Sequence, residues 1–160
     1  MDAISHEGWV GWFHPAAGPR GVVIVCAHGY EDLCSRVTLR ELADGLAARG
    51  LPTLRLDPRD TGDAGDLAAD VDRLDAWIAD AVSAVRLLRE RTGASEVVLV
   101  GFRIGALIAA EAATRLGDID HLVLMAPPAS GKAHRREQTI LARLVDGMGA
   151  GAHDDGSIEI

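Results

Sequence analysis

The sequence predicts an α/β fold with a mostly parallel, doubly wound sheet. Short, continuous apolar runs such as "VVIVCA", "EVVLV" and "HLVLMA" are typical of strands that are buried on both faces. These runs alternate with segments whose apolar residues recur at helical spacing, which is the order of a parallel sheet with crossover helices. The composition agrees, because 48% of the 160 residues are hydrophobic and 25% are charged, as in a globular domain with a core.

The first third of the chain is expected to hold three strands and one helix. Residues 8–14, "GWVGWFH", alternate and carry aromatic side chains, which predicts an edge strand. Residues 22–27 form a buried strand, and the loop "HGYEDLCS" leads from it to a helix over 36–49. Gly50 stands where a helix C-cap belongs, and residues 52–57, "PTLRLD", form the next buried strand.

The rest of the chain continues the alternation. After the Gly- and Asp-rich loop "PRDTGDAGD", a long helix is expected over 67–91, and a buried strand over 96–100. A helix of Ala, Ile and Leu follows over 104–115, and a fourth buried strand over 121–126. We expect a core domain over residues 1–146. A flexible, Gly- and Asp-rich tail follows over residues 147–160, and its final "SIEI" reads as the beginning of a further strand.

Charge and composition exclude several classes of partner. The net charge of −8 and the pI of about 5.1 oppose binding to nucleic acid or to an anionic membrane. The basic cluster "KAHRRE" is interpreted as a solvated helix start. The N-terminus lacks a secretory pattern, and no apolar run is long enough for a membrane span. Cys26 and Cys34 form neither a disulfide framework nor a metal-ligand spacing, so we expect a cytoplasmic protein without cofactor or metal.

The stretch "VGFRIGALIAA" has the frame of a site for covalent catalysis. Gly101 and Gly105 flank a tight turn from strand to helix, where only small side chains fit. The N-terminus of the following helix offers free N–H groups and the positive end of its dipole. The middle of this turn, where a nucleophile is expected, is occupied by Arg103.

Three segments, in order, resemble the α/β-hydrolase superfamily, in its serine-aminopeptidase-like branch. "CAHGYEDLCSR" resembles the oxyanion loop, "LRLDPRDTGDAGD" resembles the following strand and loop, and "VGFRIGALIAA" resembles the nucleophile elbow G-x-S-x-G. The resemblance covers about residues 21–137. More narrowly, "YEDLCSR", the Arg-bearing elbow and "APPASGKAHRRE" are similar to the exosortase-system-associated hydrolases.

This resemblance implies an esterase or peptidase whose catalytic machinery is altered. It implies oxyanion or ligand contacts at His28, Gly29, Tyr30 and Ile104. Arg103 cannot replace the serine, because guanidinium only donates hydrogen bonds and cannot attack a carbonyl. Two other nucleophiles are weaker candidates, namely Cys34, which lies near the predicted site, and Ser130, which we interpret instead as a loop cap.

Length is the second departure from the family. The resemblance places the catalytic acid and histidine after strands that follow residues 121–126, and the sequence ends at Ile160. We therefore expect a hydrolase-family chain that is catalytically inactive. The alternative is a non-catalytic module that binds an anionic or acyl ligand, or a subunit that a second chain completes. Because the sheet would be incomplete beside residues 121–126, we expect a homo-oligomer or a second chain there.

Two interpretations of Arg103 remain. With the N–H of Ile104 and the loop at His28 and Gly29, it could form a compact anion site at the carboxyl end of the sheet. It could instead pair with a nearby carboxylate, and this is the interpretation that the sequence favours. The candidate partners are Asp57, Asp60 and Glu31.

Overall fold

A computed structural model describes the chain over residues 1–150, with side chains described up to residue 144. The chain divides into two compact units, Met1–Pro127 and a second unit from Pro128 onward. The further strand expected at "SIEI" lies outside the described residues.

The first unit is built on one mixed sheet, which in the described part of the chain has six strands in the order β1-β2-β4-β3-β5-β6. Strands β4, β3, β5 and β6 run parallel, and β1 and β2 add an antiparallel hairpin beside β4. This confirms the predicted α/β class. The strands are β1 (Asp2–His6), β2 (Trp9–His14), β3 (Arg20–Val25), β4 (Thr53–Asp57), β5 (Glu96–Phe102) and β6 (His121–Met125).

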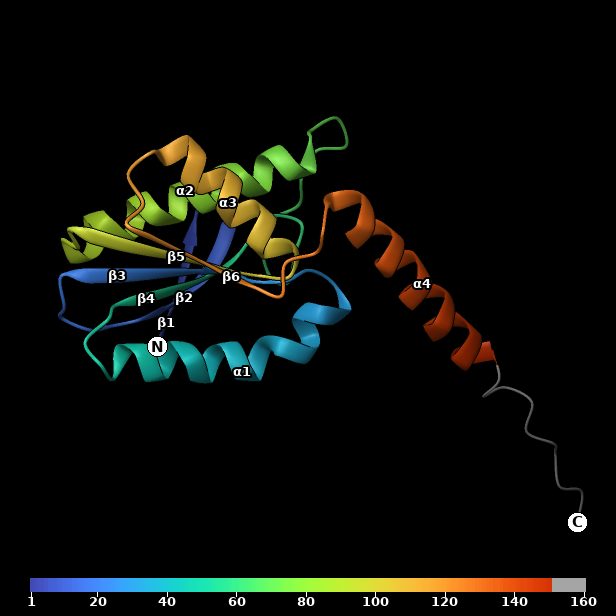
Figure 1. The fold of residues 1–160 in the computed structure, drawn as a ribbon, viewed down its shortest axis with the longest axis horizontal. Helices are drawn as coiled ribbons and strands as arrows, with labels where there is room; N and C mark the ends of the chain where they lie inside the picture. Colours follow the sequence, from blue (N-terminus) through green and yellow to red (C-terminus); the bar gives the residue numbers. More distant parts are fainter. Residues whose placement is uncertain (151–160) are drawn as a thin grey trace, which may run out of the picture. The chain divides into compact units, whose positions relative to one another are not determined.

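Helices cover both faces of the sheet, as Figure 1 shows: α1 (Tyr30–Ala47) lies on one face, and α2 (Arg73–Thr92) and α3 (Ile104–Leu116) lie on the other. Alternate side chains of β3 face opposite layers. Val23 and Val25 belong to the core under α2 and α3, whereas Val22 and Ile24 belong to the core under α1. The continuous apolar pattern of β3 therefore reflects burial on both sides.

Helix α4 (Gly131–Ala150) belongs to the second unit. Ser130 precedes it, and its hydroxyl accepts a hydrogen bond from Ala133 N over 3.2 Å. This is a helix N-cap, which confirms the interpretation of Ser130 as a cap. The last four residues of α4 fall within the tail that was predicted to begin at residue 147.

The expected position of residues 8–14 at the edge of the sheet was wrong. Strand β2 lies between β1 and β4, and β1 was not predicted. The connection from β1 to β2 is a two-residue turn at Glu7 and Gly8, both with positive φ (50° and 90°). Positive φ at both central residues is the requirement of a type I′ hairpin turn. Glu-Gly is a weaker sequence signal for this turn than Asn-Gly or Asp-Gly.

Helix α1 begins at Tyr30, six residues before the predicted start at residue 36. Gly29 has φ 64° and ψ −135°, a conformation that lets the chain turn sharply from strand to helix. Glu31 and Asp32 then lie in the first turn, where negative charge is favourable to the helix dipole. The segment expected to be a loop is therefore mostly helix.

Helix α2 begins at Arg73, six residues after the predicted start at residue 67. Asp72 is its N-cap, with a carboxylate that accepts from Asp75 N over 2.9 Å. The apolar residues before Asp72 continue the helical spacing, but the cap defines where the helix starts.

Strand β6 pairs with β5 along one side and lies at the end of the described sheet. The expectation that this strand is buried was wrong, because Leu122, Val123 and Leu124 are 41–44% exposed at the end of the described sheet. No helix among the described residues is long and apolar enough to cross a membrane.

His14, at the end of β2, is buried and connects the sheet to α1. Its Nδ1 lies 2.7 Å from Asp44 Oδ1, and its Nε2 lies 3.3 Å from Arg55 Nε. Since arginine can only donate, Nε2 accepts and Nδ1–H donates to Asp44, which requires a neutral ring. Burial lowers the pKa of His14, against the opposing influence of Asp44.

The stability of the fold is therefore expected to fall as the pH drops below about 6.5. The unfolded chain takes up a proton at His14 near its ordinary pKa, whereas the folded chain resists it, so acid favours unfolding. One such group lowers the free energy of unfolding by up to about 1.4 kcal/mol for each pH unit of acidification. Urea unfolding at pH 7.5 and 5.5 measures the difference. His14→Gln should flatten this slope, and His6→Gln, at a half-exposed histidine, should leave it unchanged; equal slopes in all three proteins would contradict the assignment.

Candidate functional site

The elbow predicted at Arg103 is present as a sharp turn between β5 and α3. Arg103 has φ 55° and ψ −121°, a strained conformation for a residue with a long side chain. Its N–H donates to Met125 O over 3.0 Å, and its carbonyl accepts from Ala106 N over 3.0 Å. These bonds fix the turn to β6 on one side and to α3 on the other.

The two flanking glycines are required by close backbone packing. A Cβ on Gly101 would lie 2.6 Å from Ala106 N. A Cβ on Gly105 would lie 2.9 Å from the carbonyl carbon of Val25 and would overlap the carbonyl oxygens of Val25 and Cys26. The first turn of α3 therefore lies directly against the end of β3, and this contact sets the position of residue 103.

The side chain of Arg103 lies at the carboxyl end of the sheet and pairs with Glu31. Arg103 Nε donates to Glu31 Oε1 over 2.6 Å, and Nη1 donates to Ala126 O over 3.3 Å. Both side chains are largely buried, at 22% and 16% exposed. The structure thus contains the ion pair that the sequence favoured. Of the other candidate partners, Asp60 pairs with Arg73, and Asp57 lies beside Asp32.

The predicted oxyanion residues follow β3 and β5 at the same edge of the sheet. The His28 ring contacts the Trp77 ring in a tilted arrangement with centroids 4.9 Å apart, and Gly29 makes the turn into α1. Tyr30 is the first residue of α1 and is 59% exposed, and Ile104 is the first residue of α3 and is buried. Two helices, α1 and α3, therefore begin beside the Glu31–Arg103 pair.

A groove lies beside the elbow, between α1 and the ends of β5 and β6. Its volume is about 350 Å³, and most of its lining is apolar. Cys34, a free and exposed thiol, lines this groove, so the sequence-predicted Cys34 does lie near the elbow. The lining residues are Glu31, Cys34, Ser35, Thr38, Leu39, Phe102, Arg103 and Met125.

A family model described as serine aminopeptidase, S33, matches residues 17–154. The chain belongs to the serine aminopeptidase S33 family. A curated relative of this S33-family chain is Esterase EstD from Thermotoga maritima, and the two sequences are 31% identical over 115 residues. That match covers 68% of this chain and 27% of the esterase.

This S33-family chain shares its fold with solved structures. An α/β serine hydrolase homologue from Coxiella burnetii superposes with a TM-score of 0.65 at 20% identity, over 82% of this chain and 64% of that chain. An esterase from Pyrococcus furiosus gives a TM-score of 0.63 at 24% identity, over 79% and 48% of the two chains. The chain therefore spans less than two thirds of the length of these proteins.

The S33-family chain also contains a buried polar cluster that the sequence analysis missed. Ligand atoms of Cys26, Asp32 and Asp57 all lie within 4.8 Å of one another. Burial raises the pKa of the Cys26 thiol, so the thiol stays neutral, and burial and then Asp32 raise the pKa of Asp57. Arg36 Nε donates to Asp32 Oδ2 over 2.7 Å. A neutral thiol beside a guanidinium is a poor donor set for a cation.

The loop after β4 is held in the S33-family chain by a second buried carboxylate. Asp80 of α2 is 2% exposed and accepts from both the N–H and the Nε of Arg59, each over 2.9 Å. Trp77 Nε1 donates to Arg59 O over 2.8 Å. Together these bonds fix the first part of the loop "PRDTGDAGD" against α2.

Proposed function

We propose that this chain is an S33-family protein that does not hydrolyse esters or amides at its elbow. The observation that supports this proposal is the 2.6 Å ion pair between Arg103 Nε and Glu31 Oε1 at the nucleophile position. A guanidinium has no lone pair for attack on a carbonyl and stays charged at all relevant pH values. Here it also donates to a carboxylate, as a structural cation does.

In this proposal the elbow has become a connection between two helices. Glu31 lies in the first turn of α1, and Arg103 is the N-cap of α3. A cation at a helix N-terminus is unfavourable by itself, because it meets the positive end of the helix dipole. The carboxylate of Glu31 offsets that repulsion and ties the starts of the two helices together.

Binding without cleavage is the second candidate function, and the groove beside the elbow favours it. Its volume of about 350 Å³ lies within the usual range of small-ligand sites. Leu39, Phe102 and Met125 supply apolar walls, and Arg103 lies at one side. An acyl chain with an anionic end has the matching chemistry.

Chromogenic esters test both candidates. We expect no turnover of p-nitrophenyl acetate or butyrate above a heat-denatured control. Arg103→Ser alone should not restore activity, because members of a catalytic triad act as a unit and a single serine gains little. Octanoate titrated into the same samples tests the groove, where saturable binding without turnover would favour the second candidate. Ester turnover that disappears on replacement of one side chain would refute the main proposal.

The partner and the biological setting are proposed on narrower grounds. We propose that a second chain, or another copy of this one, pairs with β6, which is supported by the exposure of Leu122, Val123 and Leu124 at the end of the described sheet. The similarity to exosortase-system-associated hydrolases and the cytoplasmic location remain predictions from the sequence.

A further inference from the structure

Arg55 is a buried cation without a carboxylate partner. It lies in β4, is 6% exposed, and forms no ion pair among the described residues. Its Nε donates to the neutral ring of His14, and its Nη2 lies 3.7 Å from Met1 Sδ, which is a weak acceptor. Removing a guanidinium from water is energetically unfavourable unless an opposite charge compensates. The surroundings of Arg55 supply acceptors, but no compensating charge in contact.

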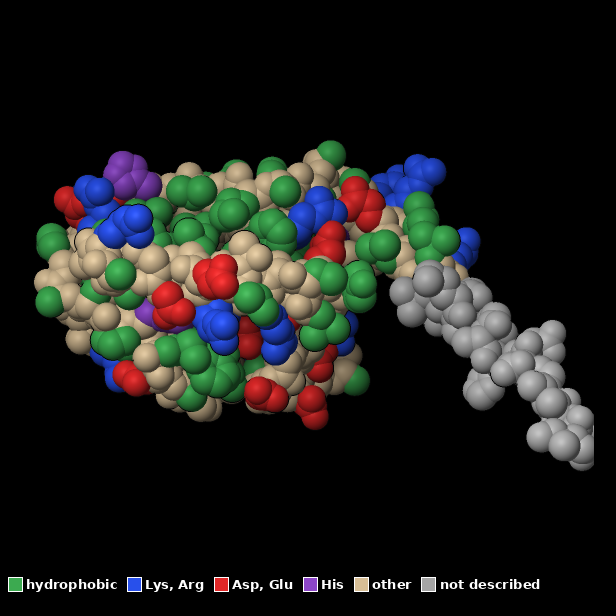
Figure 2. Space-filling model, turned by 90° about the horizontal axis from the view of Figure 1, so that it is seen from below, with side chains coloured by type: hydrophobic (Ala, Val, Ile, Leu, Met, Phe, Trp, Pro, Cys, Tyr) green, Lys and Arg blue, Asp and Glu red, His purple; other side chains and the backbone are tan. Residues whose placement is uncertain are grey.

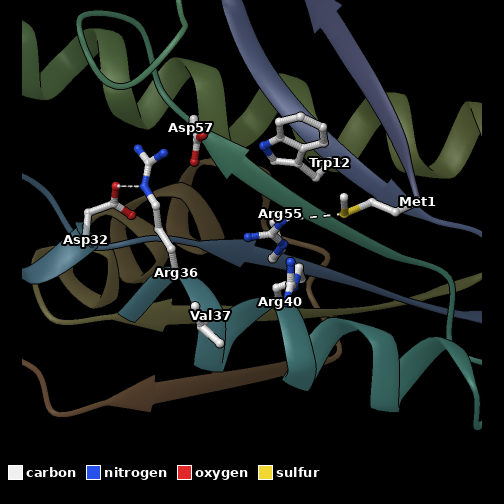
Figure 3. Close-up of a pocket in the computed structure, with 8 residues that line it drawn as sticks. All are labelled: Met1, Trp12, Asp32, Arg36, Val37, Arg40, Arg55 and Asp57. Atoms are coloured by element: carbon white, nitrogen blue, oxygen red, sulfur yellow. Dashed lines mark hydrogen bonds and ion pairs between the residues drawn. The ribbon is translucent and has the colours of Figure 1, made fainter. Parts of the chain in front are cut away.

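A pocket of about 220 Å³ lies beside this arginine, between α1 and strands β2 and β4. Figure 3 shows Arg40 of α1 reaching toward Arg55, with Met1 and Trp12 on the same side of the pocket. Arg40 is exposed and likewise forms no ion pair among the described residues. Two guanidinium groups that line one pocket repel each other unless an anion lies between them. The lining residues are Met1, Trp12, Asp32, Arg36, Val37, Arg40, Arg55 and Asp57.

Among the described residues, the two carboxylates of the pocket form no ion pair with Arg40 or Arg55, although the charges of Asp57 and Arg55 attract each other. Asp32 and Asp57 lie with Arg36 on the other side of the pocket (Figure 3). Asp32 is already bonded to Arg36 over 2.7 Å, and the pKa of Asp57 is raised by burial. The face that carries α1, seen in Figure 2, shows basic and acidic side chains gathered in its middle. Arg40 and Arg55 therefore remain as two cations that these acids do not contact.

We propose that this pocket binds a small oxyanion, the carboxylate or phosphate group of a small molecule, between Arg40 and Arg55. Guanidinium groups bind both kinds of oxyanion in a bidentate manner. Trp12 is the register partner of Arg55 across β2 and β4, and it supplies an apolar wall for the rest of the ligand. A volume of about 220 Å³ admits only a small ligand. The site is separate from the groove at Arg103.

Titration calorimetry of the full chain tests the proposal, with inorganic phosphate and acetate as the probes. We expect saturable binding of at least one of them. Arg40→Gln should weaken it by about tenfold or more, as expected for loss of a charge-assisted hydrogen bond. Arg55→Gln should have the same effect. Arg49→Gln is the matched control, because it removes the same charge just beyond α1 and outside the pocket.

The outcomes separate the sources of the anion. Binding of phosphate alone identifies a phosphorylated ligand, binding of acetate alone identifies a carboxylate, and binding of both supports the shared chemistry. If Arg55→Gln does not fold, Arg40→Gln decides, because Arg40 is exposed. Absence of saturable binding of both probes at millimolar concentrations overturns the proposal. So does a loss in Arg49→Gln equal to that in Arg40→Gln.

Discussion

Replacing Gly105 with alanine is expected to lower the free energy of unfolding by about 3 kcal/mol or more. The added Cβ would lie 2.9 Å from the carbonyl carbon of Val25 and would overlap two backbone oxygens of β3 and the residue after it. Backbone atoms of a central strand cannot move aside as a flexible side chain can. Helix α3 would have to shift away from the sheet, and its buried residues Ile108 and Ala109 would lose contacts with the core.

Thermal unfolding followed by circular dichroism measures this effect. For a chain of this size, about 3 kcal/mol corresponds to a decrease in Tm of roughly 6–12 °C. Gly45→Ala is the matched control, because among the described residues its Cβ would meet only Arg49 Nη1, at 3.5 Å. That change removes a glycine from the interior of α1 and should stabilise the fold by about 0.5–1 kcal/mol. A Gly105→Ala protein as stable as the wild type would show that the close approach of α3 to β3 is wrong.

Asp80→Asn is expected to destabilise the fold by about 3 kcal/mol, at the low end of the cost of breaking a buried ion pair. The substitution leaves Arg59 without its negative partner and turns an amide group toward its donors. The cost should be at the low end because the side chain of Arg59 keeps 29% of its surface exposed. The loop after β4 should also become more mobile, since Trp77 Nε1 depends on Arg59 O for its hydrogen bond.

Urea unfolding measures the loss, and Asp118→Asn provides the control. Asp118 also pairs with an arginine, Arg89, over 2.8 Å, but its side chain is 61% exposed. Exposed pairs contribute at most about 1 kcal/mol, so this variant should remain close to the wild type. Equal effects of the two substitutions would mean that the burial of Asp80 adds nothing to its pairing with Arg59.

The sequence predicted those parts of the fold in which a short residue pattern is determined by packing within the same few residues. The buried strands were predictable because a short, continuous apolar run such as that of β3 is typical of a strand covered on both faces. The elbow was predictable because a turn that allows no Cβ at Gly101 and Gly105 leaves a fixed spacing of glycines in the sequence. In both cases the constraint acts within a few residues of the signal.

The contacts of the site depend on where elements begin and how they are aligned, and the sequence did not specify these. Three carboxylates were candidates for Arg103, and Glu31 is its partner because α1 starts at Tyr30 rather than at residue 36. The pocket at Arg55 depends on the register of β4 against β2, which places Trp12 opposite it. Strands β2 and β4 are connected through β3 and α1 and not by a tight turn, so no local sequence signal sets this register.

The elbow has a consequence for how members of such a family diverge. The backbone at position 103 is held by glycines on either side and by bonds from the main chain, and none of these depends on which side chain the position carries. A serine and an arginine would meet the same backbone strain there. A change of side chain at this position would therefore leave these main-chain bonds in place. The backbone turn indicates the family to which a chain belongs, whereas the side chain at its centre decides which chemistry is possible. These two properties can be inherited independently.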